Sequence, residues 1–224
     1  MDLKRFSAME KLHLTVEEAK EMFIYVANKM VDSKDALTQA DKAIGDGDHG
    51  IGMARGFEAV RQKLESQSFT SIGELFKSIG MTLMMSIGGA AGAVFGTLFK
   101  GAGKNTGDQS ELDSQALTLA LQDGLQAVKD RGKAKPGDKT MVDALEPAAV
   151  KSAELDAGPL DAALMEISEA ARQGMEKTKE MVATLGKAKP LGERSLGHAD
   201  PGSLSTYLIF KYMLEFVKKG LSIG

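Results

Sequence analysis

Three aspartates stand close together in the segment from Asp41 to Gly50, which reads DKAIGDGDHG. Asp41, Asp46 and Asp48 are separated by only a few residues, and so much negative charge requires a counter-charge. Magnesium prefers oxygen ligands in octahedral geometry, and it usually keeps coordination positions for the phosphates of a substrate. The three carboxylates are therefore candidate ligands for one or two magnesium ions.

The backbone of this segment decides whether the carboxylates can meet. A continuous helix turns by about 100° per residue, which would place Asp41 and Asp48 on one face and Asp46 well away from it. The three glycines of the segment permit a sharp loop instead. A solvated acidic turn remains an alternative, because Asp-Gly pairs are common in turns.

Other motifs compete for the same residues. The glycine spacing of residues 45–50 matches the dinucleotide fingerprint, but no strand precedes it and the aspartates would repel a pyrophosphate. An EF-hand counted from Asp46 would need a glutamate where Phe57 stands. Residues 101–104, GAGK, resemble part of a P-loop, yet Asn105 breaks that pattern. His49 stays open, since it could contact a nucleotide or be an ordinary structural histidine.

The elements that must position this loop are helices. Apolar residues recur at helical spacing, Thr15 with Glu18 has the form of a capping box, and no segment alternates convincingly with period two. Helices are predicted from Thr15 to before Gly45, from about Gly50 to Leu64, from Ser71, from about Leu112 to Lys129, from Lys139 with a break near Pro147, from Pro159, and through Tyr207 to Leu221. We therefore predict one all-α domain over residues 1–224, a bundle of about eight amphipathic helices. The connections at 101–108 and 186–202 are longer than a bundle needs, and we expect function there.

Composition and charge narrow the choice of partners. Hydrophobic residues make up 43% of the 224 residues, charged residues 26% and aromatic residues 5%, which favours a helical globular protein. The formal charge is −3 without a long basic block, so we expect no nucleic acid partner. The lack of cysteine excludes disulfides and permits a reducing compartment, and the cytoplasm is the expected location. We expect no membrane span, because glycines interrupt Ile79–Phe99, and no signal peptide, because Met1–Leu14 is charged.

Four segments resemble a known family. Residues 45–50, GDGDHG, preceded by Asp41, resemble the signature of the dihydroxyacetone kinase nucleotide-binding domain, in particular the ADP-binding subunit of the phosphotransferase-system-dependent enzymes. Residues 88–96, 136–145 and 191–202 resemble the same family in the same order. The resemblance implies a barrel of eight antiparallel helices with the nucleotide at one end.

The resemblance also implies a site. Asp41, Asp46 and Asp48 would coordinate two magnesium ions that bridge the phosphates of ADP or ATP. The residues that it implies at the nucleotide are His49, Gly50, Ile51, Gly52, Gly89, Ala90, Ala91, Gly132, Met141, Lys187, Arg194, Asp200, Pro201 and Gly202.

Three of these positions depart from the family's pattern. Ala91 stands where members often carry a serine that contacts phosphate, Gly52 where an asparagine is usual, and Lys187 where an arginine would sit. Ala91 loses a hydroxyl but keeps its backbone amide, and Lys187 keeps the charge but loses the bidentate fork of arginine. Altered nucleotide affinity is the expected consequence.

The resemblance finally implies partners. In the resembled system a separate subunit holds the hydroxyketone, and a phosphoprotein of the sugar phosphotransferase system recharges bound ADP. We therefore expect no kinase activity from this chain alone, and a homodimer or a heterocomplex. Two alternatives stay open: a kinase subunit for another ketose or tetrose that uses free ATP, and a non-catalytic nucleotide-binding protein that binds a transcription regulator.

Overall fold

A computed structural model of the chain describes residues 11–221. The expected absence of a signal peptide in Met1–Leu14 falls mostly outside these residues. The described part holds nine α-helices, two strands of three residues and two short 3₁₀ segments. Their bounds are β1 His13–Thr15, α1 Val16–Asp32, α2 Lys34–Ile44, α3 His49–Glu65, α4 Ile72–Ser86, α5 Gly89–Ala102, β2 Glu111–Asp113, α6 Ser114–Gly132, α7 Val142–Glu154, α8 Leu160–Lys177, η1 Thr178–Glu180, η2 Lys189–Ser195 and α9 Pro201–Leu221.

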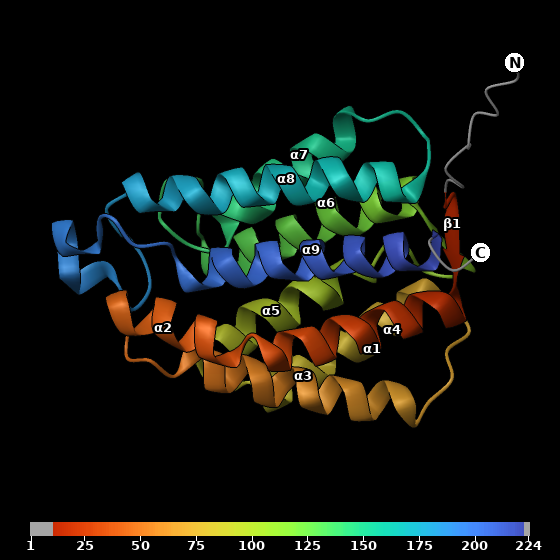
Figure 1. The fold of residues 1–224 in the computed structure, drawn as a ribbon, viewed down its shortest axis with the longest axis horizontal. Coiled ribbons are helices and arrows are strands. Elements are labelled where there is room, and N and C mark those ends of the chain that lie inside the picture. Colours follow the sequence, from red (N-terminus) through yellow and green to blue (C-terminus); the bar gives the residue numbers. More distant parts are fainter. Residues whose placement is uncertain (1–10, 222–224) are drawn as a thin grey trace, which may run out of the picture.

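Eight of the helices form a closed ring (Figure 1). Going round it, α1 packs on α3, each helix from α3 to α8 packs on the next, and α9 packs on both α8 and α1. Neighbours in the ring run antiparallel, while α2 continues α1 past one end of the ring and contacts α3 and α9 there. The prediction of an all-α barrel or bundle is confirmed.

Aromatic side chains fill part of the interior of the ring. The ring of Phe23 on α1 meets Phe76 on α4 and Phe99 on α5 edge to face, with centroids 5.5 and 5.9 Å apart. All three belong to one apolar cluster that draws residues from every helix of the ring. Burying such a side chain contributes about 1.5–3 kcal/mol, so this cluster accounts for much of the stability.

Capping residues mark where two helices begin. The N–H of Glu18 donates to Thr15 Oγ1 and the N–H of Thr15 donates to Glu18 Oε2, which completes the predicted capping box before α1. Ser71 accepts a hydrogen bond from the N–H of Glu74 at the start of α4, as expected from its position.

Two expected features of the helices were wrong. The helix predicted from Thr15 to before Gly45 is two helices, α1 and α2, which meet at Ser33. The helix α7 is continuous through Pro147, because its buried residues pack against α6 and α8 on both sides of that proline. The strands β1 and β2 pair antiparallel, but runs of three residues are too short to reveal a period of two.

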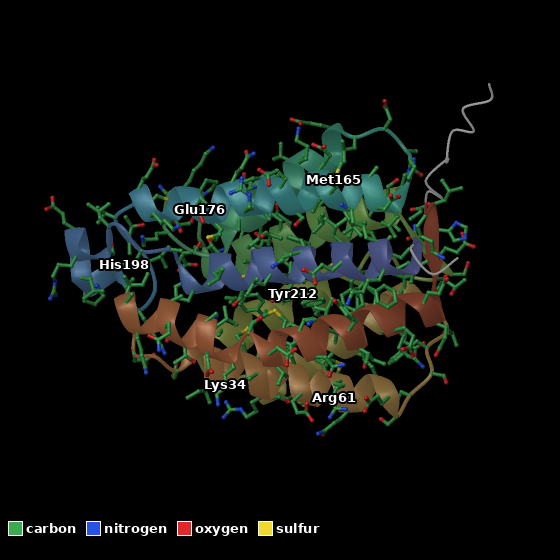
Figure 2. The ribbon with its side chains drawn as sticks, in the orientation of Figure 1. Lys34, Arg61, Met165, Glu176, His198 and Tyr212 are labelled. Atoms are coloured by element: carbon green, nitrogen blue, oxygen red, sulfur yellow. The ribbon has the colours of Figure 1, made fainter. Side chains whose placement is uncertain are left out.

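The two ends of the ring differ. The strand pair β1–β2 lies at one end, and α2 lies at the other beside the segment 178–200, which joins α8 to α9 and contains η1 and η2 (Figure 1). His198, labelled in Figure 2, lies in this segment at the extreme end of the molecule. Among residues 11–221, no helix combines the length and the apolar character that crossing a membrane requires.

Candidate functional site

A cavity of about 530 Å³ opens at the end of the ring where α2 lies. The first residues of α3, α5 and α9 line it, as do the last residue before α7 and the first residue of α7. Backbone N–H groups at helix N-termini carry partial positive charge, and this effect is confined to the first turn. Four such turns at one cavity make its wall suited to an anion such as a phosphate group.

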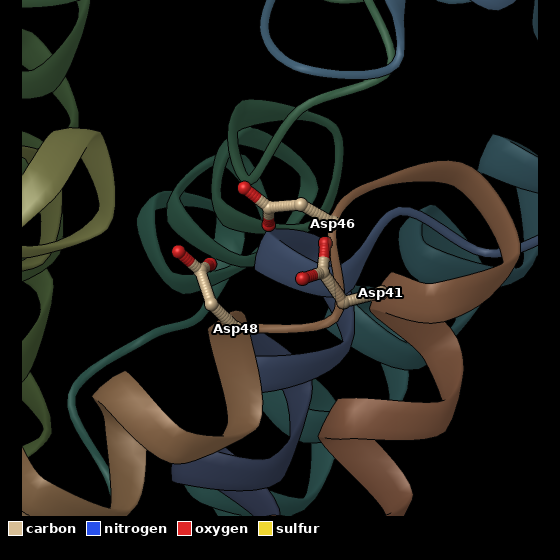
Figure 3. Close-up of side chains that lie close together, drawn as sticks. All are labelled: Asp41, Asp46 and Asp48. Atoms are coloured by element: carbon tan, nitrogen blue, oxygen red, sulfur yellow. The ribbon is translucent and has the colours of Figure 1, made fainter.

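Three carboxylates meet at the mouth of this cavity. Single carboxylate oxygens of Asp41, Asp46 and Asp48 all lie within 4.8 Å of one another. Figure 3 shows the three side chains converging from the end of α2, the turn that follows it, and the start of α3. The turn passes through Gly47 with a φ of 79°, so the predicted glycine loop does bring Asp46 back towards the other two.

Asp41 is held in place from both sides of the turn. Its side chain is buried, and Oδ2 accepts a hydrogen bond of 3.0 Å from the backbone N–H of His49. A Cβ at Gly45 would lie only 2.2 Å from Asp41 Oδ1. The carboxylate can therefore occupy this position only because residue 45 has no side chain.

A cation already lies among these carboxylates. The ammonium of Lys187 donates to Asp46 Oδ1 at 2.8 Å and Oδ2 at 2.7 Å, and to Asp48 Oδ1 at 2.9 Å. The hydrogen bonds that Lys187 donates to the Asp46 and Asp48 carboxylates raise the pKa of Lys187, and the hydrogen bond from Lys187 lowers the pKa of Asp46. Two of the three carboxylates thus already bind a positive charge, and the three together supply the oxygen donors that magnesium prefers.

His49 faces the cavity from the first position of α3. Its Nε2 lies 2.8 Å from the hydroxyl of Ser205 on α9, and its ring lies 6.3 Å from the ring of Phe95. Burial lowers the pKa of His49, while the carboxylates of Asp41 and Asp48 act in the opposite direction. The imidazole is thus favoured in its neutral form, able to donate from one nitrogen only.

Asp200 and Lys139 also contribute to the lining of the cavity. Asp200 caps α9, since Oδ2 accepts a hydrogen bond of 2.7 Å from the N–H of Ser203. Lys139 is 1% exposed and has a φ of 62°, and its ammonium donates to the carbonyls of Thr178 and His198. Burial raises the pKa of Asp200 to about 7 and lowers the pKa of Lys139.

Most residues that the sequence singles out line this one cavity. They are Asp41, Asp48, His49, Ile51, Gly52, Gly89, Ala90, Ala91, Gly132, Met141, Lys187, Asp200, Pro201 and Gly202. Asp46 lies outside the lining but shares the ammonium of Lys187 with Asp48. Of the two long connections, 186–202 contributes to the lining and 101–108 does not.

Gly50 and Arg194 do not line the cavity. Gly50 is buried against α2, where a Cβ would lie 2.3 Å from the carbonyl oxygen of Lys34 and from Thr38 Oγ1. Its small size therefore serves the packing of α3 on α2. Arg194 is exposed in η2.

Several lining residues were not predicted. Lys139 and Thr140 approach the cavity from the segment before α7, and Arg55 from α3, where it donates to the carbonyls of Ser86 and Ile87. The segment 136–145 was recognised as a whole, but its pattern does not indicate that Lys139 is buried. The positive φ of Lys139 has no signal in the sequence, because lysine is not a residue that favours it.

Comparison with known proteins places these features in a family. The profile described as the DAK2 domain matches residues 43–215. The "PTS-dependent dihydroxyacetone kinase, ADP-binding subunit" of Lactococcus lactis is 37% identical over 208 residues, which cover 91% of this chain and 99% of that relative. The "L-erythrulose 1-kinase" of Mycolicibacterium smegmatis is 35% identical over 193 residues, which cover 84% of this chain and 33% of that enzyme.

A solved structure shares the fold. The crystal structure of the dihydroxyacetone kinase from C. freundii in complex with AMP-PNP and Mg²⁺ matches with a TM-score of 0.69 and 26% identity. The match covers 96% of this chain and 36% of that one, so this chain corresponds to about a third of the longer kinase.

Proposed function

This chain belongs to the DAK2 domain family, and on that premise we propose that it is the ADP-binding subunit of a dihydroxyacetone-type kinase. Its role in this proposal is to bind ADP or ATP with magnesium and to present the terminal phosphate to a small hydroxyketone held by a partner subunit. The names of the Lactococcus lactis relative and of the C. freundii kinase support the nucleotide and the substrate class.

One observation carries the proposal. Three carboxylates lie at the mouth of a cavity whose wall is formed by the first turns of four helices. Helix N-termini favour anions, whereas clustered aspartates repel them unless a cation intervenes. In a metal-bound nucleoside phosphate, the metal can bind the aspartates and the phosphates can bind the helix N-termini. A free phosphate or a metal alone matches only one of these two features.

The residues have distinct parts in the proposed mechanism. Asp41, Asp46 and Asp48 hold magnesium, which when bound offsets the charge of the phosphate oxygens during transfer. Residues Gly89 to Ala91 present backbone N–H groups at the start of α5, where the phosphates are expected. Ala91 contributes no hydroxyl there, so we expect its contribution to come from the backbone.

The cavity also has an apolar lining that suits the base. Apolar side chains from several segments contribute to it, among them Ile44 at the end of α2 and Met141 and Val142 around the start of α7. Apolar lining with few polar groups is the usual environment of a nucleobase or a similar ligand. We propose that Met141 packs against the base and that Gly132, Pro201 and Gly202 complete this part of the site.

The number of metal ions and the phosphoryl donor are part of the proposal. Three aspartates provide enough oxygen atoms for two magnesium ions, provided that phosphate oxygens and water complete each shell. A phosphoprotein of the phosphotransferase system is the proposed donor, because the Lactococcus lactis relative is named PTS-dependent. The proposed assembly is a complex of this chain with a hydroxyketone-binding subunit and that donor.

A second candidate differs in substrate. The relative from Mycolicibacterium smegmatis is an L-erythrulose 1-kinase, and 35% identity to it is close to the 37% found with the PTS-dependent subunit. In this alternative the chain serves a tetrose kinase and exchanges free ATP. The two candidates differ in how long nucleotide stays bound.

Native mass spectrometry of the freshly purified chain, with and without chelation of magnesium, tests the proposal. We expect ADP to remain bound, to leave on chelation, and to exchange slowly against labelled ATP. Rapid exchange would favour the ATP-using alternative. A chain that binds no nucleotide with magnesium present would overturn both and point to a non-catalytic role.

A further inference from the structure

The position of Lys187 relative to the metal site carries an inference beyond this function, although it depends on the proposed metal site. Its ammonium lies 2.7–2.9 Å from three oxygens of Asp46 and Asp48. We propose that Lys187 is an internal cation that competes with the divalent metal for these two carboxylates. Metal binding would then release Lys187 towards the phosphates in the cavity.

The geometry requires the two cations to exclude each other. Magnesium lies about 2.0–2.1 Å from its oxygen ligands. An ion bridging Asp46 and Asp48 must lie among the oxygens that now surround the ammonium, where the two cations would overlap and repel each other. In the proposal the ammonium gives way, because its flexible four-carbon stem lets it swing aside while the metal keeps its carboxylate ligands.

The ion pair is of the kind that a metal can displace. The side chains of Lys187, Asp46 and Asp48 are 52%, 55% and 68% exposed. Exposed pairs contribute little to stability, since water and salt screen them. Lys187 therefore neutralises part of the charge of the acidic site, but its ion pairs are weak enough for a metal ion to replace them.

The surroundings restrict the movement to the side chain. On one side, the Thr184 hydroxyl donates to Asp138 Oδ1 at 2.6 Å and its N–H to the carbonyl of the same residue. On the other side, Ala188 is buried in a small apolar cluster with Ile44 and Ala183. Between these two anchors Lys187 already lines the cavity, so the proposed movement is a rotation of its side chain and needs no shift of the backbone.

The two positions of Lys187 predict opposite effects of one substitution. In Lys187→Met the competitor is lost, so a metal ion alone should bind more tightly. The same variant also loses a cation facing the phosphates, so metal together with ADP should bind more weakly. A lysine that merely stabilises the local structure would not produce opposite signs.

The test measures Mn²⁺ binding to the nucleotide-free chain by electron paramagnetic resonance, and then Mn²⁺-ADP binding by calorimetry. Lys187→Met should bind Mn²⁺ about two- to fivefold more tightly than the unmodified chain and bind Mn²⁺-ADP more weakly. Lys187→Arg keeps the competing charge, so it should not gain Mn²⁺ affinity, and it should not bind Mn²⁺-ADP more weakly than the unmodified chain. Lys189→Met removes an exposed lysine two residues away and is the matched control.

The outcomes separate the inference from the proposed function. Unchanged or weaker Mn²⁺ binding in Lys187→Met would overturn the competition, as would an equal gain in Lys189→Met, which would indicate a general effect of charge. If the unmodified chain and Asp46→Asn take up Mn²⁺ equally or not at all, the metal site itself is wrong. Tighter Mn²⁺ binding confined to Lys187→Met, together with weaker Mn²⁺-ADP binding, would support the inference.

Discussion

The Nε2 atom of His49 lies 2.8 Å from the hydroxyl oxygen of Ser205, and this contact joins the first turn of α3 to the second turn of α9. Ser205 is fully buried, and both helices begin at the cavity. The contact therefore fixes the separation of two of the four helix N-termini that form the proposed phosphate-binding wall.

Loss of this contact should cost stability. Ser205→Ala removes one partner and leaves a nitrogen of His49 unpaired in a largely buried position, which should lower the free energy of unfolding by about 1–3 kcal/mol. Urea denaturation measures this change. The control is Ser68→Ala, which alters an exposed serine before α4 and should have almost no effect. Equal stability of the two variants would show that the contact contributes nothing.

Replacement of Asp46 tests the metal site without disturbing the fold. The side chain is exposed and belongs to the turn after α2, so Asp46→Asn should leave the helical circular dichroism unchanged. Affinity for magnesium-ADP, measured by calorimetry, should fall by at least about tenfold, because an amide is a much weaker magnesium ligand than a carboxylate. Asp156→Asn, in the exposed connection before α8, is the control. Unchanged affinity would be incompatible with the proposed ligand set.

Asp200 should make stability depend on pH. Burial raises its pKa to about 7 from the usual 3.8, so the folded chain holds a proton in a range where the unfolded chain has lost it. Its stabilising contribution is complete below about pH 3.8 and is lost as pH rises towards 7.

Asp200→Asn isolates this contribution. Asparagine also accepts the hydrogen bond that caps α9, but it does not titrate. The difference in unfolding free energy between the variant and the unmodified chain should therefore shift in favour of the variant as pH rises from ~5 to ~7.5. Urea denaturation at both values gives the difference. A constant difference would place the pKa of Asp200 near its ordinary value.

Gly50 tests the contact between α2 and α3. In Gly50→Ala the new methyl group would lie 2.3 Å from the carbonyl oxygen of Lys34, so the two helices must separate. We expect a loss of about 1–3 kcal/mol in urea denaturation. Gly220→Ala has open space around it in the last turns of α9 and should be neutral or slightly stabilising. Equal effects of both changes would contradict this account.

Local signals predicted much of the fold. These signals depend on residues within a few positions of one another. They are the Thr15 capping box, the Ser71 cap, the apolar spacing and the glycine loop that brings the aspartates together. Such features are readable because the interaction and the pattern share one short segment.

The remaining features depend on distant contacts. Lys139 can be buried because its ammonium donates to the carbonyls of residues 178 and 198. Gly50 must be small because a carbonyl of α2 lies against it. The continuity of α7 through Pro147 likewise reflects neighbours on α6 and α8. None of these partners can be recognised from the residues adjacent to the position in question.

The closed ring also limits how the length of this chain can change. A ring in which every helix runs antiparallel to both neighbours requires an even number of helices, and this ring has eight. The helix α2 does not change that number, because it prolongs α1 in the same direction and is not a member of the ring. Inserting or deleting one helix between α3 and α9 would reverse every later helix and would present carbonyl ends to the cavity in place of N–H groups. Size variation that keeps the site is therefore restricted to helix pairs or to the connections at the end where β1 and β2 meet.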